Sequence, residues 1–300
     1  MGEESEAGRL SVPAAEEILG KEFPVLDHGF VRLVDYMGGD DSIVQAARVS
    51  YGKGTKKISE DRGLIRYLMR HRHTTPFEMV ELKFHAKMPI FVARHWIRHR
   101  TASVNEYSLR YSEPENEFYI PKPEEVRFQS VTNRQGSSEE KVSEETAQKV
   151  IDFLSSTSED SMGKYQSMNK DNIARELARI GLPINIYTQW YWKIDLHNLF
   201  HFLSLRADPH AQWEIREYAK IMGEITRSVA PNAYESFQDY VLNSINFSGP
   251  EMQAMKQILS GVNLSELESL AKGFPTKREG IEFLEKMKVF QGALNPSSQS

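Results

Sequence analysis

The sequence predicts an α+β fold in which a mixed, largely antiparallel sheet is flanked by helices. Apolar and polar residues alternate over 79–88 and again over 184–194, and this period of two is typical of half-buried strands. Apolar residues recur at helical spacing in the segments around them. Neither a Gly-x-Gly-x-x-Gly nor a P-loop motif occurs in the sequence, so no Rossmann-type nucleotide site is expected.

Composition excludes several classes of protein. The chain has 300 residues, of which 40% are hydrophobic, enough for a substantial core. Its net charge of -5 argues against a protein that coats nucleic acid or anionic membrane. Without cysteine there can be no disulfide, thiolate metal site or thiol nucleophile. No secretory signal or apolar run of about 18 residues is visible, so a cytoplasmic protein is the simplest interpretation.

The first half of the chain is expected to contain three helices and two strands. Residues 1–22 are acidic and predict a flexible extension before a folded domain at 23–248. Thr75, Pro76 and Glu78 have the spacing of a capping box. In the strand that follows, Val80, Leu82, Phe84 and Ala86 are expected to face the core. The remaining elements are helices at 42–50, from Ser59 to His71 and after Pro89, and a strand at 117–121.

The second half alternates between surface segments and core elements. Residues 122–170 are polar and predict an insertion that contains an amphipathic helix. Asp171 has the position of an N-cap for a helix with Ile173, Leu177 and Ile180 inside. Asp195 and Asp208 are expected to cap two further helices, with Pro209 at a first helical position. Helical patterns at 251–271 and 277–289 predict a C-terminal helical extension over 249–300.

The stretch RHRTASVNEYSLR, residues 98–110, carries the densest set of hydrogen-bonding side chains. Arginine forks match phosphate and imide oxygens, and several of them together can hold a multiply charged ligand. Ser103, Asn105, Glu106 and Ser108 add donors and acceptors, and a negative Glu106 would orient the arginines. The alternative is a solvated basic helix end.

The histidines and Arg206 leave alternatives open. His95 and His99 are four residues apart, as are His197 and His201, but no HExxH glutamate or acidic ligand cluster accompanies them, and we expect no metal. His197 and His201 are either satisfied helix histidines or groups that contact a cofactor. Arg206 follows an apolar helix face, so its head needs an anion or acceptor; a structural ion pair with Asp208 is the alternative to a ligand.

These residues resemble the flavin-dependent thymidylate synthases, the ThyX family. Residues 98–110 match that family's RHRxxSxNExSxR signature at every specified position. HRHTTPFE, PIFVARHWIRHR, EFYIP, ARIGLPINIYT and LRADPHAQWEI resemble its further blocks in the same order. The resemblance covers roughly residues 24–121 and 171–235 and implies a ThyX-type fold.

The resemblance implies reductive methylation of dUMP to dTMP, with methylenetetrahydrofolate as carbon donor and FAD, reduced by NADPH, as hydride carrier. Since the chain has no cysteine to attack the uracil ring, activation would be electrostatic. By resemblance the catalytic residues are Arg206, beside uracil N3 and O4, and His73, which supports flavin reactivity. Ser108 resembles a nucleophile but is expected to bind phosphate.

Two sets of binding residues are carried over from the family. The dUMP set is His95, Trp96, Ile97, Arg98, Glu106, Tyr107, Ser108, Leu109, Arg110, Arg179 and Arg206. The FAD set is Thr75, Arg98, His99, Arg100, Glu106, Asp195, Leu196, His197 and His201. His95 stands where the family commonly has Gln, and Asp195 where it often has Asn.

The family also implies a homotetramer whose sites are shared between subunits, and neither nucleic acid nor membrane as a partner. Two other functions fit parts of the sequence. A phosphate-recognising nucleic-acid-binding module would account for the arginines and nearby aromatic residues. A metal-dependent nucleotide hydrolase would need a bound metal.

Overall fold

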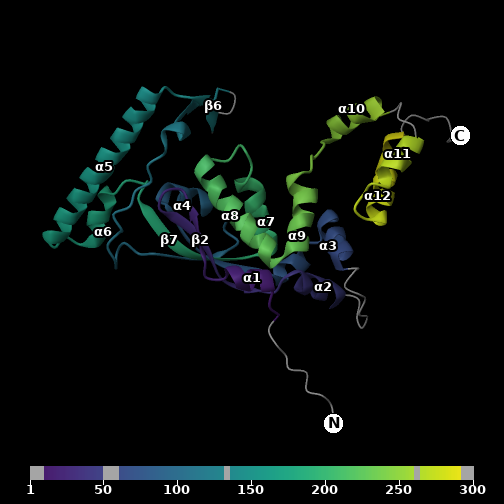
Figure 1. The fold of residues 1–300 in the computed structure, drawn as a ribbon, viewed down its shortest axis with the longest axis horizontal. Coiled ribbons are helices and arrows are strands. Elements are labelled where there is room, and N and C mark those ends of the chain that lie inside the picture. Colours follow the sequence, from purple (N-terminus) through teal and green to yellow (C-terminus); the bar gives the residue numbers. More distant parts are fainter. Residues whose placement is uncertain (1–9, 50–60, 132–135, 260–263, 292–300) are drawn as a thin grey trace, which may run out of the picture. The chain divides into compact units, whose positions relative to one another are not determined.

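The computed structural model describes residues 10–49, 61–131, 136–259 and 264–291. The chain forms two compact units, Met1–Leu242 and Asn243–Ser300. The first unit contains the sheet and all of the predicted site residues (Figure 1). Its longest helix is α5 (Glu144–Lys170), within the segment expected to be an insertion.

A five-stranded sheet with the order β1-β2-β3-β7-β4 forms the centre of the first unit. Its neighbouring strands all pair antiparallel, so the predicted α+β fold with a largely antiparallel sheet is confirmed. The longest pairing joins β3 and β7 from Glu81↔Asp195 to Pro89↔Tyr187. The strands are β1 (Glu22–Val25), β2 (Gly29–Met37), β3 (Glu81–Pro89), β4 (Ser103–Glu106) and β7 (Tyr187–Asp195).

One face of this sheet forms the main core. The alternating apolar residues of β3 that were expected to point inward are all buried. Trp96 lies at the centre, with its ring centroid 5.4 Å from that of Trp192 and 5.1 Å from that of Phe202. Helices α4 (Ile90–Trp96), α7 (Leu196–Arg206) and α8 (Trp213–Val229) lie together at this face (Figure 1). The core packing therefore fixes the C-terminal ends of α4 and α7, where several of the predicted site residues lie.

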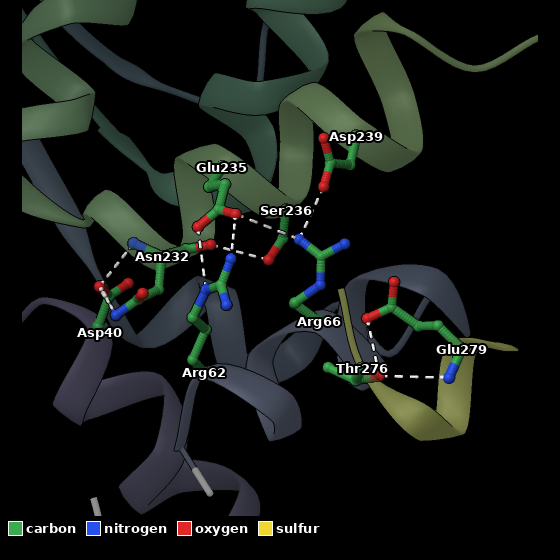
Figure 2. Close-up of polar contacts among 9 residues, drawn as sticks. All are labelled: Asp40, Arg62, Arg66, Asn232, Glu235, Ser236, Asp239, Thr276 and Glu279. Carbon is green, nitrogen blue, oxygen red and sulfur yellow. Dashed lines mark hydrogen bonds and ion pairs between the residues drawn. The ribbon is translucent and has the colours of Figure 1, made fainter. Parts of the chain in front are cut away.

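Three further helices pack beside the sheet: α2 (Asp40–Val49), α3 (Asp61–Arg70) and α9 (Pro231–Phe237). Asp40 joins α2 to α9, because its carboxylate accepts hydrogen bonds from the backbone N–H groups of Asn232 and Ala233 at 2.8 and 3.0 Å. Figure 2 shows the Asp40–Asn232 contact. Burial raises the pKa of Asp40, although these hydrogen bonds act in the opposite direction.

The N-terminal part is more structured than its acidic composition predicted. Helix α1 (Pro13–Ile18) and the start of β1 lie inside the segment expected to be a flexible extension. Ala15 is fully buried, and Tyr36 accepts a hydrogen bond from the Val12 N–H through its hydroxyl at 2.8 Å. The apolar face of α1 packs against the domain, and this packing orders a segment that is rich in acidic residues. Residues 1–9 lie outside the described part of the chain.

Two predicted helix starts differ from the structure. Residues Thr75–Met79 form the short 3₁₀ helix η2 after Thr74, and no side-chain hydrogen bond caps it, so the predicted capping box is wrong. Asp208 does not cap α8, which begins at Trp213. Instead its carboxylate accepts hydrogen bonds from the N–H and ring Nδ1 of His210 at 2.7 and 2.8 Å, which closes a local turn. The predicted cap at Ser59 lies outside the described residues.

Two predicted elements around the insertion are also wrong. The segment 117–121 is not a strand but makes a single bridge, Phe118↔Ile186. The expected helix from Asp171 reduces to α6 (Arg175–Ala178) and a 3₁₀ turn, η4 (Arg179–Gly181), and Asp171 instead ends α5. Of its expected core residues, Ile180 is 74% exposed. The spacing therefore predicted too long a helix and the wrong buried face, because Ala178 rather than Ile180 is buried.

The stretch after Pro89 contains a shorter helix than predicted. Because α4 ends at Trp96, residues 98–100 lie in the turn that follows it, and the predicted loop contains strand β4. The insertion also contains a two-stranded hairpin, β5 (Arg127–Gln129) and β6 (Ser137–Lys141), before α5.

The second unit consists of α10 (Gly249–Leu259), α11 (Leu264–Ala271) and α12 (Lys277–Gln291). The helical pattern predicted over 251–271 corresponds to two helices, α10 and α11. Within the unit, the rings of Phe274 and Phe283 stack with centroids 4.9 Å apart. Thr276 accepts a hydrogen bond from the Glu279 N–H at 3.2 Å (Figure 2). Over the described residues, no helix combines the length and apolarity required to span a bilayer.

Candidate active site

Two histidines of α4 and its following turn hold the side chain of Arg206, the last residue of α7. Arg206 donates from Nε to His99 Nε2 over 3.0 Å and contacts His95 Nε2 through Nη1 over 2.7 Å. Because a guanidinium can only donate, both Nε2 atoms must be unprotonated acceptors, with the ring proton of each neutral histidine on Nδ1. The packing of α4 against α7 therefore holds the Arg206 guanidinium in one orientation.

The charge state of this cluster follows from burial and from the guanidinium. Burial, followed by the charge of Arg206, lowers the pKa of His99 from 6.5 to about 4. The same two causes lower the pKa of His95. Burial and the nearby Arg98 lower the pKa of Arg206, but arginine starts so high that it remains charged. At neutral pH the site is one permanent cation between two neutral imidazoles.

Arg206 is not paired with Asp208, the alternative considered for a structural role. The Asp208 carboxylate is occupied by His210, two residues further along its own turn. Arg206 makes no ion pair with a carboxylate anywhere in the described ranges. Its charge is only partly neutralised by imidazole dipoles, so it remains available to a ligand.

A cavity of about 230 Å³ lies beside this cluster, between the end of α3, η2, α7 and the end of α9. His73, His197 and His201 line it together, although they come from two distant parts of the sequence. The cavity also has an aromatic lining, to which Phe77, Phe200 and Phe237 contribute. The structure thus brings together three of the residues expected at a flavin or its reactive centre.

His99 connects the cation to this cavity. Its ring contacts Arg206 on one side, and its centroid lies 5.7 Å from that of His201, which lines the cavity, on another. The area predicted to bind dUMP, around Arg206, and the area predicted to bind FAD, around His201, are therefore joined by the buried imidazole of His99.

The arginine-rich turn supplies further positive charge near Arg206. The side chains of the exposed Arg98 and Arg100 make no hydrogen bond or ion pair with a residue the structure describes, and the same holds for the side chain of Arg179 in η4. Arg110 forms an ion pair with Glu176 of α6 at 3.2 Å. This pair links the end of the predicted phosphate-binding stretch to the segment that carries Arg179.

Strand β4 positions the second half of that stretch. Glu106 accepts a hydrogen bond from the Thr188 hydroxyl at 2.8 Å, and the Tyr107 N–H donates to the Gln189 carbonyl at the same distance. The expectation that Glu106 orients the arginines is not met, because its carboxylate instead accepts from a threonine on β7. Ser108 accepts from the Arg110 N–H at 3.3 Å, within a turn.

Several predicted binding residues have their side chains occupied elsewhere. Trp96 and Leu196 are fully buried in the core, so neither side chain is available to a ligand. Ile97 is partly buried against the same core. Asp195 caps α7, accepting from the N–H and side-chain amide of Asn198 at 2.9 and 2.7 Å. Thr75 begins η2 and Leu109 lies in the turn after β4.

Sequence reasoning missed part of the cavity. Phe77, Phe200 and Phe237 were not singled out, since aromatic residues at helical spacing are usually core. Arg72 was also overlooked, although it lines the cavity next to His73. Its place in the stretch HRHT, directly beside a candidate histidine, was the available signal. The described residues contain no group of three histidine or acidic side chains arranged to hold a metal ion.

A sheet-and-helix fold that presents a fixed guanidinium, free arginines and an aromatic cavity defines a binding site for an anionic ligand that bears a planar ring. Residues 32–232 match the family model described as thymidylate synthase complementing protein. The chain belongs to this family, the flavin-dependent thymidylate synthases, which confirms the resemblance carried by residues 98–110.

Relatives and a solved structure support this assignment. The chain is 51% identical over 294 residues to a flavin-dependent thymidylate synthase of Rickettsia conorii, covering 94% of this chain and 98% of the relative. It is 56% identical to one of Wolbachia pipientis, over 87% and 92% of the two chains. A UMP/dUMP methylase, PolB from Streptomyces cacaoi bound with 5-Br dUMP, superposes with a TM-score of 0.66 at 34% identity, covering 73% of this chain and 98% of that one.

Proposed function

We propose that this chain is a flavin-dependent thymidylate synthase that methylates dUMP to dTMP. Its relatives bear that name at more than half identity, and the solved UMP/dUMP methylase shares its fold. The observation that carries the proposal is the cation Arg206, held by two neutral histidines beside the cavity that His201 lines. The reaction is therefore assigned to a site built from these residues.

Arg206 activates the pyrimidine electrostatically. When its free face lies against uracil N3 and O4, the guanidinium stabilises negative charge that develops on the ring, and C5 becomes nucleophilic. A half-buried cation is effective here because the surrounding protein screens it less than bulk water would. The chain has no cysteine, so attack on the ring by a thiolate is not available to it.

The arginine-rich stretch holds the phosphate and sugar of dUMP. Arg98 and Arg179 are free to form bidentate contacts, since neither has a partner among the described residues. Arg110 is engaged by the exposed Glu176, and an exposed pair of this kind exchanges easily for a phosphate. His95, Arg98 and Arg206 thus define the nucleotide end of the site.

The residues at the cavity fit a flavin. Three imidazoles, a serine hydroxyl and several phenyl rings line it, and none of its lining residues is acidic. A planar isoalloxazine with an apolar face and a polar edge matches this donor set. Bound FAD would supply the hydride that completes the methyl group. His73, His197 and His201 would contact the ring system, and Arg98 and Arg100 are free for its phosphates.

The carbon donor and the reductant complete the proposal. We assign these roles to methylenetetrahydrofolate and NADPH, on the strength of the family alone.

Tritium release from C5-labelled dUMP tests the reaction. Purified protein should bind FAD, release tritium when methylenetetrahydrofolate and NADPH are present, and form dTMP. Omission of either co-substrate should prevent dTMP formation. A preparation that ignores both FAD and dUMP, and instead binds oligonucleotides in a salt-dependent way, would replace the proposal with the nucleic-acid-binding alternative.

A homotetramer with shared sites is also part of the proposal. Leu177, Ile180 and Ile184 are 58, 74 and 66% exposed, and they flank Arg179 on a segment whose inward-facing residue is Ala178. Such a cluster is typical of a protein–protein contact. A second copy covering it would bring new side chains next to Arg179. Sedimentation of Ile180→Glu, with Phe153→Glu on exposed α5 as control, tests this: a tetramer that survives the first change contradicts it.

A further inference from the structure

Arg72 has an unusual backbone conformation immediately before His73. Helix α3 ends at Arg70, after which the N–H groups of Arg72 and His73 donate to the Met69 and Leu68 carbonyls at 3.1 and 2.9 Å. Arg72 itself has φ of 58°, in the left-handed region. Glycine is the usual residue at this position of a helix C-terminus, because a side chain there is strained. The chain therefore keeps an arginine where the backbone favours glycine.

The side chain of Arg72 is also unlike those of its neighbours. The three preceding arginines of α3 all have partners: Arg62 with Glu235, Arg66 with Asp239 and Arg70 with the Tyr240 hydroxyl at 3.2 Å. Figure 2 shows the first two of these pairs. The Arg72 guanidinium makes no hydrogen bond or ion pair with any residue in the described part of the chain. Strain without a structural contact indicates that the side chain serves a ligand.

The surroundings of Arg72 specify the chemistry of that ligand. The cavity it lines contains His73, His197 and His201 and lacks any aspartate or glutamate. Phenyl rings make up much of its remaining wall. A guanidinium fork above such a lining fits a planar ring that carries a phosphate or carboxylate group.

We propose that Arg72 binds an oxyanion of the ring-bearing ligand that occupies this cavity. The inference rests on the proposed function, which offers three sources of such an oxyanion. They are the diphosphate of FAD, the 2′-phosphate of NADPH and the glutamate carboxylates of the folate. Arg72 is thereby a specificity-determining residue, since each of these ligands has an analogue that lacks the charged group.

Arg72→Gly separates this role from folding, because glycine relieves the backbone strain while it removes the guanidinium. Its melting temperature should be no lower than that of the natural chain. Affinity for the ligand that Arg72 contacts should fall about tenfold, the loss typical of one charge-assisted hydrogen bond. Arg72→Lys should retain part of this affinity, and Arg127→Gln, on the exposed hairpin strand β5, should retain all of it.

Three paired comparisons identify the source of the oxyanion: FAD against riboflavin, NADPH against NADH, and folate with and without its glutamate. In the pair that contains the true ligand, Arg72→Gly should lose the preference for the charged member. An Arg72→Gly enzyme that equals the natural one in all three pairs overturns the inference. Failure of the natural chain to bind FAD or dUMP would instead overturn the proposed function, so the two failures are distinguishable.

Discussion

Arg206 donates from Nε to Nε2 of His99 over 3.0 Å, and this bond joins residues 107 positions apart in the sequence. The imidazole is buried, and its second neighbour, His201, lines the adjoining cavity. A neutral acceptor orients the guanidinium without cancelling its charge, which a carboxylate partner would do. The structure therefore supports an arginine that acts on a ligand.

Removal of the Arg206 charge is expected to abolish most turnover without unfolding the protein. Arg206→Ala should lower kcat by about 10² to 10³, the loss seen when one preorganised transition-state donor is deleted. The fold should survive, because the guanidinium is only half-buried and the α7 core contacts come from other residues. Tritium release and thermal denaturation measure the two effects separately.

A matched control for this variant is Arg227→Ala, which removes an exposed arginine paired with Glu224 at 3.0 Å. It should leave turnover unchanged and cost less than about 1 kcal/mol of stability. Natural turnover in Arg206→Ala would show that the pyrimidine is activated by another group.

The state of His99 should make the site sensitive to acid. The neutral form is stabilised in the fold, since the pKa is lowered from 6.5 to about 4 by burial and then by Arg206, His201 and His95. Its contribution to stability is therefore complete above pH 6.5 and is lost as pH falls towards 4. Protonation would also remove the acceptor that holds Arg206. Ring NMR signals should place the His99 titration near pH 4.

His99→Gln tests the consequence, because an amide oxygen can accept from Arg206 but does not titrate in this range. Between pH 6.5 and 4, its free energy of unfolding should fall less steeply than that of the natural chain. His95, whose pKa is lowered by the same two causes, remains in both proteins and leaves a residual slope. Equal slopes in urea denaturation series would contradict the assignment of the acid sensitivity to His99.

The sheet could be predicted from the sequence because one of its faces is buried. Alternation in β3 places Leu82, Phe84 and Ala86 on that face, and a register shift of one residue would move all three to the opposite face. The cap of α7 was also predictable, because Asp195 acts on a backbone N–H only three residues away. Both features could be predicted because each depends on residues that are close together in the sequence.

The remainder depends on contacts that no local pattern contains. Ile173, Leu177 and Ile180 have helical spacing, but they are 45, 58 and 74% exposed in the part of the chain that the structure describes. The sequence allowed an ion pair between Asp208 and Arg206, but in the structure the Asp208 carboxylate bonds to His210 instead. The convergence of His95, His99 and Arg206 follows from the way α4 packs against α7. The candidate residues could be named from sequence, but their pairing could not.

Ser108 is expected to be dispensable for covalent chemistry. Its hydroxyl accepts from the Arg110 N–H at 3.3 Å inside a turn. Among the described residues, this hydroxyl donates to no histidine or carboxylate that could act as a base and activate it as a nucleophile. Ser108→Ala should therefore retain measurable turnover while dUMP affinity falls a few-fold. Complete loss of turnover with natural dUMP affinity would instead indicate a covalent serine adduct.

Arg66 is expected to stabilise the wall of the cavity from behind. Its side chain is 2% exposed and donates to Asp239 at 2.7 Å, and its guanidinium carbon lies 4.9 Å from the centre of the Tyr240 ring. Asp239, whose ion pair with Arg66 is drawn in Figure 2, and Tyr240 belong to one π-helical turn, η5 (Gln238–Leu242). Val241 of this turn and Phe237, the residue before it, line the cavity. The buried arginine thus anchors a kind of turn that is rare in proteins.

Arg66→Ala should cost about 2–4 kcal/mol of unfolding free energy, because it leaves a void and breaks a partly buried ion pair. FAD affinity should fall with it, since the wall formed by Phe237 and Val241 loses its anchor. Arg62→Ala, one helical turn earlier, removes a guanidinium that pairs with Glu235 at the surface and should cost less than about 1 kcal/mol. Urea denaturation and flavin titration of the two variants, measured side by side, check this order. Equal losses would show that burial of Arg66 adds nothing to its ion pair.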